Sequence, residues 1–208
     1  MGNQVALSIR LRNALSARLF RIRYGRSLAA FGPGTNVVRP EMLIGARYIS
    51  IGAGVVIAPN AYLAAMEIIP GNKPNLTIED GTRIGRNNHI FATNQIHIGK
   101  RVLTAGNVYI ADNSHGYEDP DVAILDQPLL QLAPVSIGDG TWIGNGASVL
   151  GASVGRNCVV GAGAVLRSNV PDHCLVVGAP ARIVKRYDRV QGRWRRTQPD
   201  GSFCNGGD

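Results

Sequence analysis

The chain has 208 residues, of which 45% are hydrophobic and 26 are glycine, and its formal net charge is +8. This length suits one domain with modest ends, and no stretch approaches the roughly 20 apolar residues of a membrane-spanning helix. The three cysteines are widely spaced without a Cys-x-x-Cys pair. That usage argues against a disulfide framework or a zinc knuckle and favours a reducing, cytoplasmic location.

The positive charge lies at the two ends of the chain. Residues 1–40 contain seven arginines and no acidic residue, and residues 182–208 contain seven basic residues against three aspartates. Residues 41–181 contain eight basic and eleven acidic residues. Because the middle of the chain lacks the interleaved basic and aromatic residues of a nucleic-acid groove, we expect no nucleic-acid partner.

Residues 4–24, within an N-terminal segment of residues 1–31, are predicted to form an amphipathic helix. Four aliphatic residues make its apolar stripe: Leu7, Leu11, Leu15 and Ile22. Three arginines lie mostly off the stripe: Arg10, Arg18 and Arg21. We expect this helix to cover the end of the following repeats or to pack in an oligomer, since the ends of a solenoid must be covered. The alternative is a basic helix that lies on an anionic membrane surface, peripheral to its inner face.

Aliphatic residues then return every six positions, most regularly through Ile137, Ile143 and Val149. This period is neither the 3.6 residues of a helix nor the alternation of a two-faced sheet. It is typical of a parallel β-helix, in which each hexad forms one flat side and three hexads, about 18 residues, form a turn. We therefore predict an all-β fold, with a β-helix over residues 32–177.

The repeat stops between residues 113 and 134, which are predicted to form a long external loop. This segment contains four acidic residues and three prolines. Its apolar residues, among them Val122, Ile124 and Leu125, argue against free disorder. Long loops on a rigid scaffold are usually functional, so we expect this loop to pack on another surface such as a neighbouring subunit. Residues 178–208 are predicted to form a basic segment and tail.

Three features together resemble the hexapeptide-repeat acyltransferases: the hexads, the loop that begins Asn113-Ser114-His115, and the ending VGAPARIVKRY. The resemblance covers roughly residues 32–190 and is most specific in TWIGNGASVLGASVGRNCVVGAGAVLRSNVP. It is closest to the O-acetyltransferases of polysaccharide biosynthesis and more distant to the maltose and galactoside acetyltransferases. It implies a left-handed β-helix, a homotrimer with active sites between subunits, and acetyl-CoA as the donor. The fold also occurs in zinc enzymes, but we expect no metal, because His115 lacks a second histidine five residues away in either direction.

His115 aligns with the catalytic histidine of that family and lies where the last regular hexad gives way to the loop. An imidazole titrates near neutral pH, so it can accept the proton of a sugar hydroxyl as the oxygen attacks the thioester. We expect direct transfer in a ternary complex, because no serine or cysteine stands in a recognisable nucleophile motif. Asp112, Asn113 and Glu118 are candidates to orient the imidazole or contact the acceptor.

The resemblance also suggests residues that contact the two substrates. Asn94 aligns roughly with an asparagine that contacts the acceptor. The candidates for the pantetheine arm and the phosphates of CoA are Trp142, Gly144, Ala147, Gly161, Ala162, Arg167, Arg182 and Lys185. The small residues among them have an alternative role, since the corners of a β-helix need small residues in any case.

The leading hypothesis is therefore an acetyl-CoA-dependent O-acetyltransferase acting on a sugar of a surface polysaccharide or its precursor. One alternative is acetylation of a small diffusible acceptor, such as an antibiotic or a free sugar. Another is a non-catalytic β-helix that serves as a scaffold module. The scaffold hypothesis does not account for the loop, His115 or the basic C-terminal segment.

Overall fold

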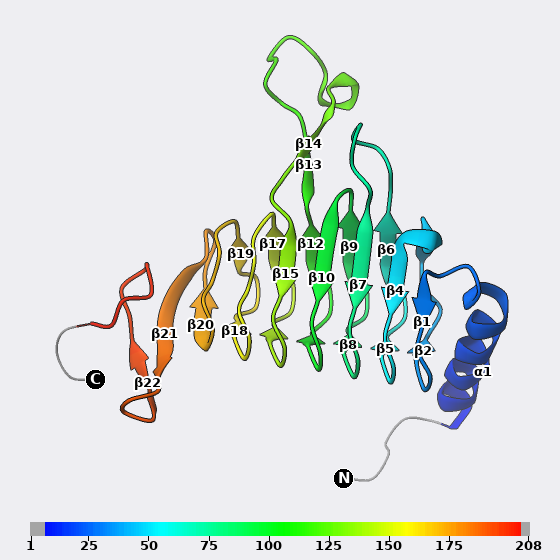
Figure 1. Ribbon diagram of the computed structural model, residues 1–208, viewed down its shortest axis with the longest axis horizontal. Coiled ribbons are helices and arrows are strands. Elements are labelled where there is room, and N and C mark those ends of the chain that lie inside the picture. Colours follow the sequence, from blue (N-terminus) through cyan, green and yellow to red (C-terminus); the bar gives the residue numbers. More distant parts are fainter. Residues whose placement is uncertain (1–6, 205–208) are drawn as a thin grey trace.

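The structure is a computed structural model that describes residues 7–204. Its strands wind into one long coil with three flat sides, and a loop projects from one side (Figure 1). Each side is a sheet, and through most of the chain consecutive strands move from one sheet to the next. The prediction of a mostly β fold built from parallel strands is confirmed.

The three sheets contain nearly all of the strands. The first sheet contains β1 (Ala30–Phe31), β4 (Ile49–Ile51), β7 (Asn75–Ile78), β10 (Gln95–Ile98) and β15 (Val135–Ile137). The second contains β2 (Asn36–Val37), β5 (Val56–Ile57), β8 (Arg83–Ile84), β11 (Leu103–Thr104), β16 (Trp142–Ile143), β18 (Val159–Val160), β20 (Cys174–Val177), β21 (Arg182–Asp188) and β22 (Arg193–Arg196). The third contains β3 (Met42–Ile44), β6 (Tyr62–Ala65), β9 (His89–Ala92), β12 (Tyr109–Ala111), β17 (Ser148–Leu150) and β19 (Val165–Leu166). A short 3₁₀ helix, η1 (Ala46–Tyr48), precedes β4.

Aliphatic columns fill the interior of the coil. In the first sheet Ile51, Ile78, Ile98 and Ile137 pair in register, and all four are fully buried. Burial of each such side chain contributes about 1.5–3 kcal/mol. Because one inward position recurs on each side, the columns account for the six-residue period of the sequence.

The length of one turn differs from the expected 18 residues. Asn36 pairs with Val56, a step of 20 residues, whereas Trp142 pairs with Val159, a step of 17, and Val159 pairs with Leu175, a step of 16. The turns without an inserted loop therefore become shorter toward the C-terminus. In these last turns the first sheet is reduced to isolated bridges at Val154 and Val170, which shortens the turn.

An asparagine ladder marks the corner between the second and third sheets. Asn60, Asn87 and Asn107 all have a positive φ, of 62°, 55° and 58°. The Nδ2 of Asn60 donates to the Oδ1 of Asn87 (3.3 Å), and the Nδ2 of Asn87 donates to the Oδ1 of Asn107 (3.0 Å). Gly146 and Gly163 occupy the same corner in later turns, each with a φ of 67°. Asparagine and glycine are the residues that most readily adopt this left-handed conformation.

Helix α1 (Leu7–Tyr24) covers the N-terminal end of the coil. Ala17 and Phe20 are buried there, and the ring of Phe20 lies 6.0 Å from that of Phe31. The predicted apolar stripe makes no part of this contact, because its four residues are exposed: Leu7, Leu11, Leu15 and Ile22. Predicted helix residues 4–6 lie outside the described residues. Within residues 7–204, no helix is long and apolar enough to cross a membrane.

A hairpin closes the C-terminal end of the second sheet. β21 pairs antiparallel with β20, and β22 pairs antiparallel with β21. The buried Asp188 accepts a hydrogen bond from Nη1 of Arg195 at 2.8 Å, which joins the two hairpin strands. Residues 182–196 of the predicted C-terminal segment thus extend the sheet.

The external loop has a two-stranded stem, β13 (Asn113–His115) and β14 (Leu129–Gln131), which pair antiparallel. A 3₁₀ turn, η2 (Ile124–Asp126), lies within the loop beyond the stem. Val122, Ile124 and Leu125 are exposed, and Leu125 retains 87% of its accessible surface. These three apolar residues of the loop therefore remain largely open to solvent in the single chain.

Candidate active site

His115 is the last residue of β13, at the point where the external loop leaves the coil. Its backbone pairs with Leu129 across the stem. Its side chain is exposed, and among the described residues no hydrogen bond or ion pair reaches the imidazole. Both ring nitrogens are thus accessible to a substrate and to a residue of another chain.

Buried polar contacts hold the root of the loop. The Asp112 carboxylate, which is fully buried, accepts the backbone N–H groups of Thr93 (2.7 Å), Asn94 (2.8 Å) and Gln95 (2.7 Å). The Gln131 amide nitrogen donates to the Asp112 carbonyl oxygen (2.5 Å), and its amide oxygen accepts the Thr93 hydroxyl (3.0 Å). Hydrogen bonds to a charged group contribute about 1.5–3 kcal/mol each. The stem that carries His115 is therefore fixed to the neighbouring turn.

Asn113 takes part in the same arrangement. Its Nδ2 donates to the carbonyl oxygen of Phe91 at 3.0 Å, and the residue is buried. The side chains of Asp112 and Asn113 are thus committed to the loop root rather than to the imidazole. Glu118 is exposed on the loop, and the side chain of Asn94 is half-buried.

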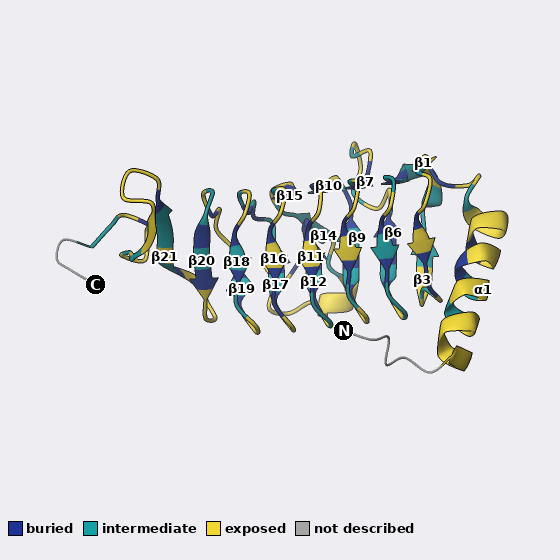
Figure 2. Cartoon of the chain, turned by 90° about the horizontal axis from the view of Figure 1, so that it is seen from below, coloured by how far each residue is buried: buried dark blue, intermediate teal, exposed yellow. Residues whose placement is uncertain are grey.

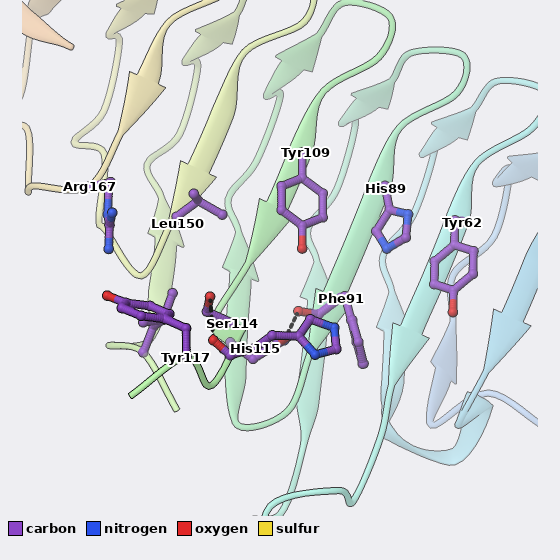
Figure 3. Close-up of a pocket in the computed structure, with 11 residues that line it drawn as sticks. Tyr62, His89, Phe91, Tyr109, Ser114, His115, Tyr117, Leu150 and Arg167 are labelled. Atoms are coloured by element: carbon purple, nitrogen blue, oxygen red, sulfur yellow. Dashed lines mark hydrogen bonds between the residues drawn. The ribbon is translucent and has the colours of Figure 1, made fainter. Parts of the chain in front are cut away.

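A cavity of about 450 Å³ lies beside His115 on the outer face of the third sheet (Figure 3). Aromatic and imidazole rings from three successive strands line it: Tyr62, His89, Phe91 and Tyr109. The rings of Tyr62 and His89 stack with centroids 4.1 Å apart, and Tyr109 meets His89 edge-on at 5.2 Å. We call this space the aromatic cavity. The loop adds Tyr117 to its wall.

Burial sets the protonation of two of these rings. It lowers the pKa of His89 below the usual 6.5, an effect that the negative charge of Glu41 partly opposes. It also raises the pKa of Tyr109. Near pH 7 the cavity wall is therefore uncharged at both positions, and the Tyr109 hydroxyl keeps its proton.

The candidate cofactor residues divide between two faces. Arg167 lines the aromatic cavity with His115. Trp142 lies on β16 of the second sheet, where it is half-exposed. Arg182 and Lys185 are exposed on β21 of the same sheet. One chain therefore brings His115 and Arg167 together but not His115 and Trp142.

The small candidate residues lie at the corners between the second and third sheets. A Cβ on Gly144 would come within 2.6 Å of the Ala162 backbone nitrogen, and one on Gly161 within 2.8 Å of Val177. Ala147 is fully buried, whereas Ala162 is exposed. Stacking of successive turns alone accounts for the two glycines, so their presence does not by itself indicate a ligand.

The sequence reasoning missed the ring-bearing residues of the cavity. Tyr62, His89 and Tyr109 share one row of the third sheet, but they are 27 and 20 residues apart along the chain. Their positions side by side on neighbouring strands follow from the exact length of each turn, which the sequence pattern does not provide. Among residues 7–204 no group of three or more His, Cys, Asp or Glu side chains is arranged to hold a metal ion.

Comparison with known proteins finds similarity to acyltransferases in sequence and in fold. The family model for the hexapeptide repeat of succinyl-transferase matches residues 134–168. The probable acetyltransferase Rv3034c of Mycobacterium tuberculosis is 35% identical over 178 residues, which cover 80% of this chain and 57% of that protein. The Escherichia coli protein named provisionally as the lipopolysaccharide biosynthesis O-acetyl transferase WbbJ is 32% identical over 56% of this chain and 63% of its own length.

Solved structures share the fold. AntD, an N-acyltransferase from Bacillus cereus in complex with dTDP and 3-hydroxybutyryl-CoA, superposes with a TM-score of 0.65 at 15% identity, over 91% of this chain and 93% of AntD. The likeness to AntD is one of fold, a coil of stacked parallel strands. Residues 134–168 of the chain match the model of this repeat, and the curated relatives are named as acetyltransferases. The chain spans less than two thirds of the length of these two relatives.

Proposed function

We propose that the protein transfers an acetyl group from acetyl-CoA to a hydroxyl of a sugar in a surface polysaccharide or its precursor. The observation that carries this proposal is an exposed imidazole, carried on a fixed backbone at the edge of a ring-lined cavity. Rings suit the apolar faces of a pyranose, while Arg167 and the Tyr109 hydroxyl supply polar contacts. The names of the curated relatives support the same class of reaction.

In the proposed reaction, His115 accepts the proton of the acceptor hydroxyl as its oxygen attacks the thioester carbonyl. A C–O bond forms and a tetrahedral oxyanion develops, which backbone N–H groups would stabilise. The C–S bond then breaks, and the imidazolium returns the proton to the departing thiolate of CoA. The products are the acetyl ester and CoA, and no covalent enzyme intermediate is needed.

We also propose that the active protein is a homotrimer of left-handed β-helices. Two observations support it: His115 and Trp142 lie on different faces of one chain, and Val122, Ile124 and Leu125 are exposed on the loop. In a closed ring, the second sheet of one subunit would face the aromatic cavity of the next. CoA would then lie between them, with Glu118 or another residue near a subunit boundary orienting His115. Three free cysteines suit the proposed cytoplasmic location.

Thiol release from acetyl-CoA with a panel of neutral sugars, amino sugars and polysaccharide fragments tests the reaction. The variant His115→Ala should lose roughly 10²- to 10⁴-fold in kcat, the usual contribution of a general base. His97→Ala is the matched control, because His97 is half-buried on β10 in the first sheet, away from the cavity. Near-normal turnover by His115→Ala would overturn the assignment.

A further inference from the structure

Helix α1 carries two apolar faces on opposite sides. The inner face packs on the coil through Ala17 and Phe20, which are 7% and 4% exposed. Each residue turns about 100° around a helix axis, so Leu15 lies about 200° from Ala17, and Ile22 lies about 200° from Phe20. Five exposed aliphatic residues share this outer face: Leu7, Leu11, Leu15, Leu19 and Ile22.

The outer face points away from the coil at one end of the molecule (Figure 2). Leu11 and Leu15 are 62% and 60% exposed, and Ile22 is 72% exposed. Full burial of each such side chain would be favourable by roughly 1.5–3 kcal/mol, so exposing the whole row to water is substantially unfavourable. No described residue of the chain covers it.

Arginines border the row on both sides. Arg12 and Arg18 are each three residues from Leu15, in opposite directions, so they lie about 60° to either side of it. Both are exposed, and neither makes a hydrogen bond or an ion pair with any residue in the described range 7–204. Residues 1–40 contain no acidic residue that could neutralise them.

We propose that the outer face of α1 binds the surface of an anionic lipid bilayer. Leucines flanked by cations match such a surface, with the apolar row in the acyl boundary and the guanidinium groups among anionic headgroups. Pairing the same face of two copies would instead bring arginine rows together without a counter-charge. Because α1 lies across the end of the coil, binding would leave the coils extending away from the bilayer.

Co-sedimentation of the full chain with vesicles tests this proposal. The protein should bind vesicles of phosphatidylcholine with phosphatidylglycerol, bind pure phosphatidylcholine at least roughly tenfold more weakly, and dissociate as salt rises. The double variants Leu11→Glu/Leu15→Glu and Arg12→Glu/Arg18→Glu should each lower the partition coefficient by more than roughly tenfold.

Matched controls use exposed residues of the same types elsewhere. Val190→Glu replaces an aliphatic residue that is 97% exposed at the other end of the molecule. Arg83→Glu/Arg101→Glu removes two exposed arginines from the coils. Both controls should bind anionic vesicles as the wild type does.

An equal loss of vesicle binding in these controls would overturn the proposal. Equal binding to anionic and to neutral vesicles would overturn it as well. A third contrary outcome combines two results: the protein does not bind vesicles, and Leu11→Glu/Leu15→Glu forms a smaller assembly in light scattering. These results would assign the outer face to a contact between copies. Acetyl transfer to a soluble acceptor should be unchanged in every α1 variant. Failure of membrane binding is therefore distinguishable from failure of the proposed reaction.

Discussion

Asn87 adopts the backbone conformation of a corner and also bonds to the corners of the adjacent turns. It holds a φ of 55° while its amide bonds to asparagines in the turns before and after it. A side chain that cannot form hydrogen bonds does not compensate for this backbone conformation. For such a residue the left-handed region costs about 1–2 kcal/mol.

Asn87→Ala should therefore lower the free energy of unfolding by about 2–3 kcal/mol, which combines the backbone penalty with the lost amide hydrogen bonds. Asn87→Gly keeps the favourable backbone and should lose only about 1 kcal/mol. Urea unfolding of both variants measures the difference. Equal losses would mean that the hydrogen bonds alone, and not the φ angle, select asparagine at this corner.

At the scale of one element, the loop stem shows how His115 combines an exposed side chain with a fixed backbone. Gln131 on β14 joins the stem to Asp112 and Thr93 of the coil. A general base must be held close to the productive geometry, and a displacement of about 1 Å can cost 10²-fold in rate.

Gln131→Ala should consequently lower kcat by about 10- to 100-fold while the fold and the affinity for CoA persist. Steady-state kinetics measures the change in kcat, and limited proteolysis of the loop measures whether the fold persists there. Gln95→Ala is the control, because Gln95 lies near the loop root and is exposed, and its backbone N–H rather than its side chain bonds to Asp112. Unchanged kcat in Gln131→Ala would show that other contacts suffice to position His115.

The elements also show what the sequence could and could not predict. Inward positions such as Ile78 and Ile98 must be aliphatic in every turn, so the hexads predict the β-helix and its core. The row of Tyr62, His89 and Tyr109 depends on turn length, which the residues at the corners and the inserted loops decide. The sequence also shows the apolar stripe through Leu11 and Leu15, but this stripe is exposed in the structure. A second, smaller apolar face on α1 makes the contact with the coil.

At the scale of the whole molecule, a shared site predicts complementation between inactive variants. His115→Ala and Trp142→Ala should each be weakly active alone, because every site then lacks one part. Co-expressed in equal amounts, they should form mixed trimers in which about a quarter of the interfaces are intact, since each interface draws two subunits at random.

Acetyl transfer by the co-expressed protein should therefore recover to about a quarter of the wild-type rate. Variants purified separately and then mixed, without exchange of subunits, provide the control and should stay inactive. If co-expression restored nothing while native mass spectrometry showed mixed trimers, each site would belong to a single chain.

The C-terminal hairpin has a consequence for the protein in a crowded cell. β22 forms the outer edge of the longest sheet, and three of its four residues are arginine. The open edge of a sheet is a template on which another molecule could add its own strands. Because two such edges would meet with like charges, fibre growth by end-to-end addition is opposed at this end of the chain.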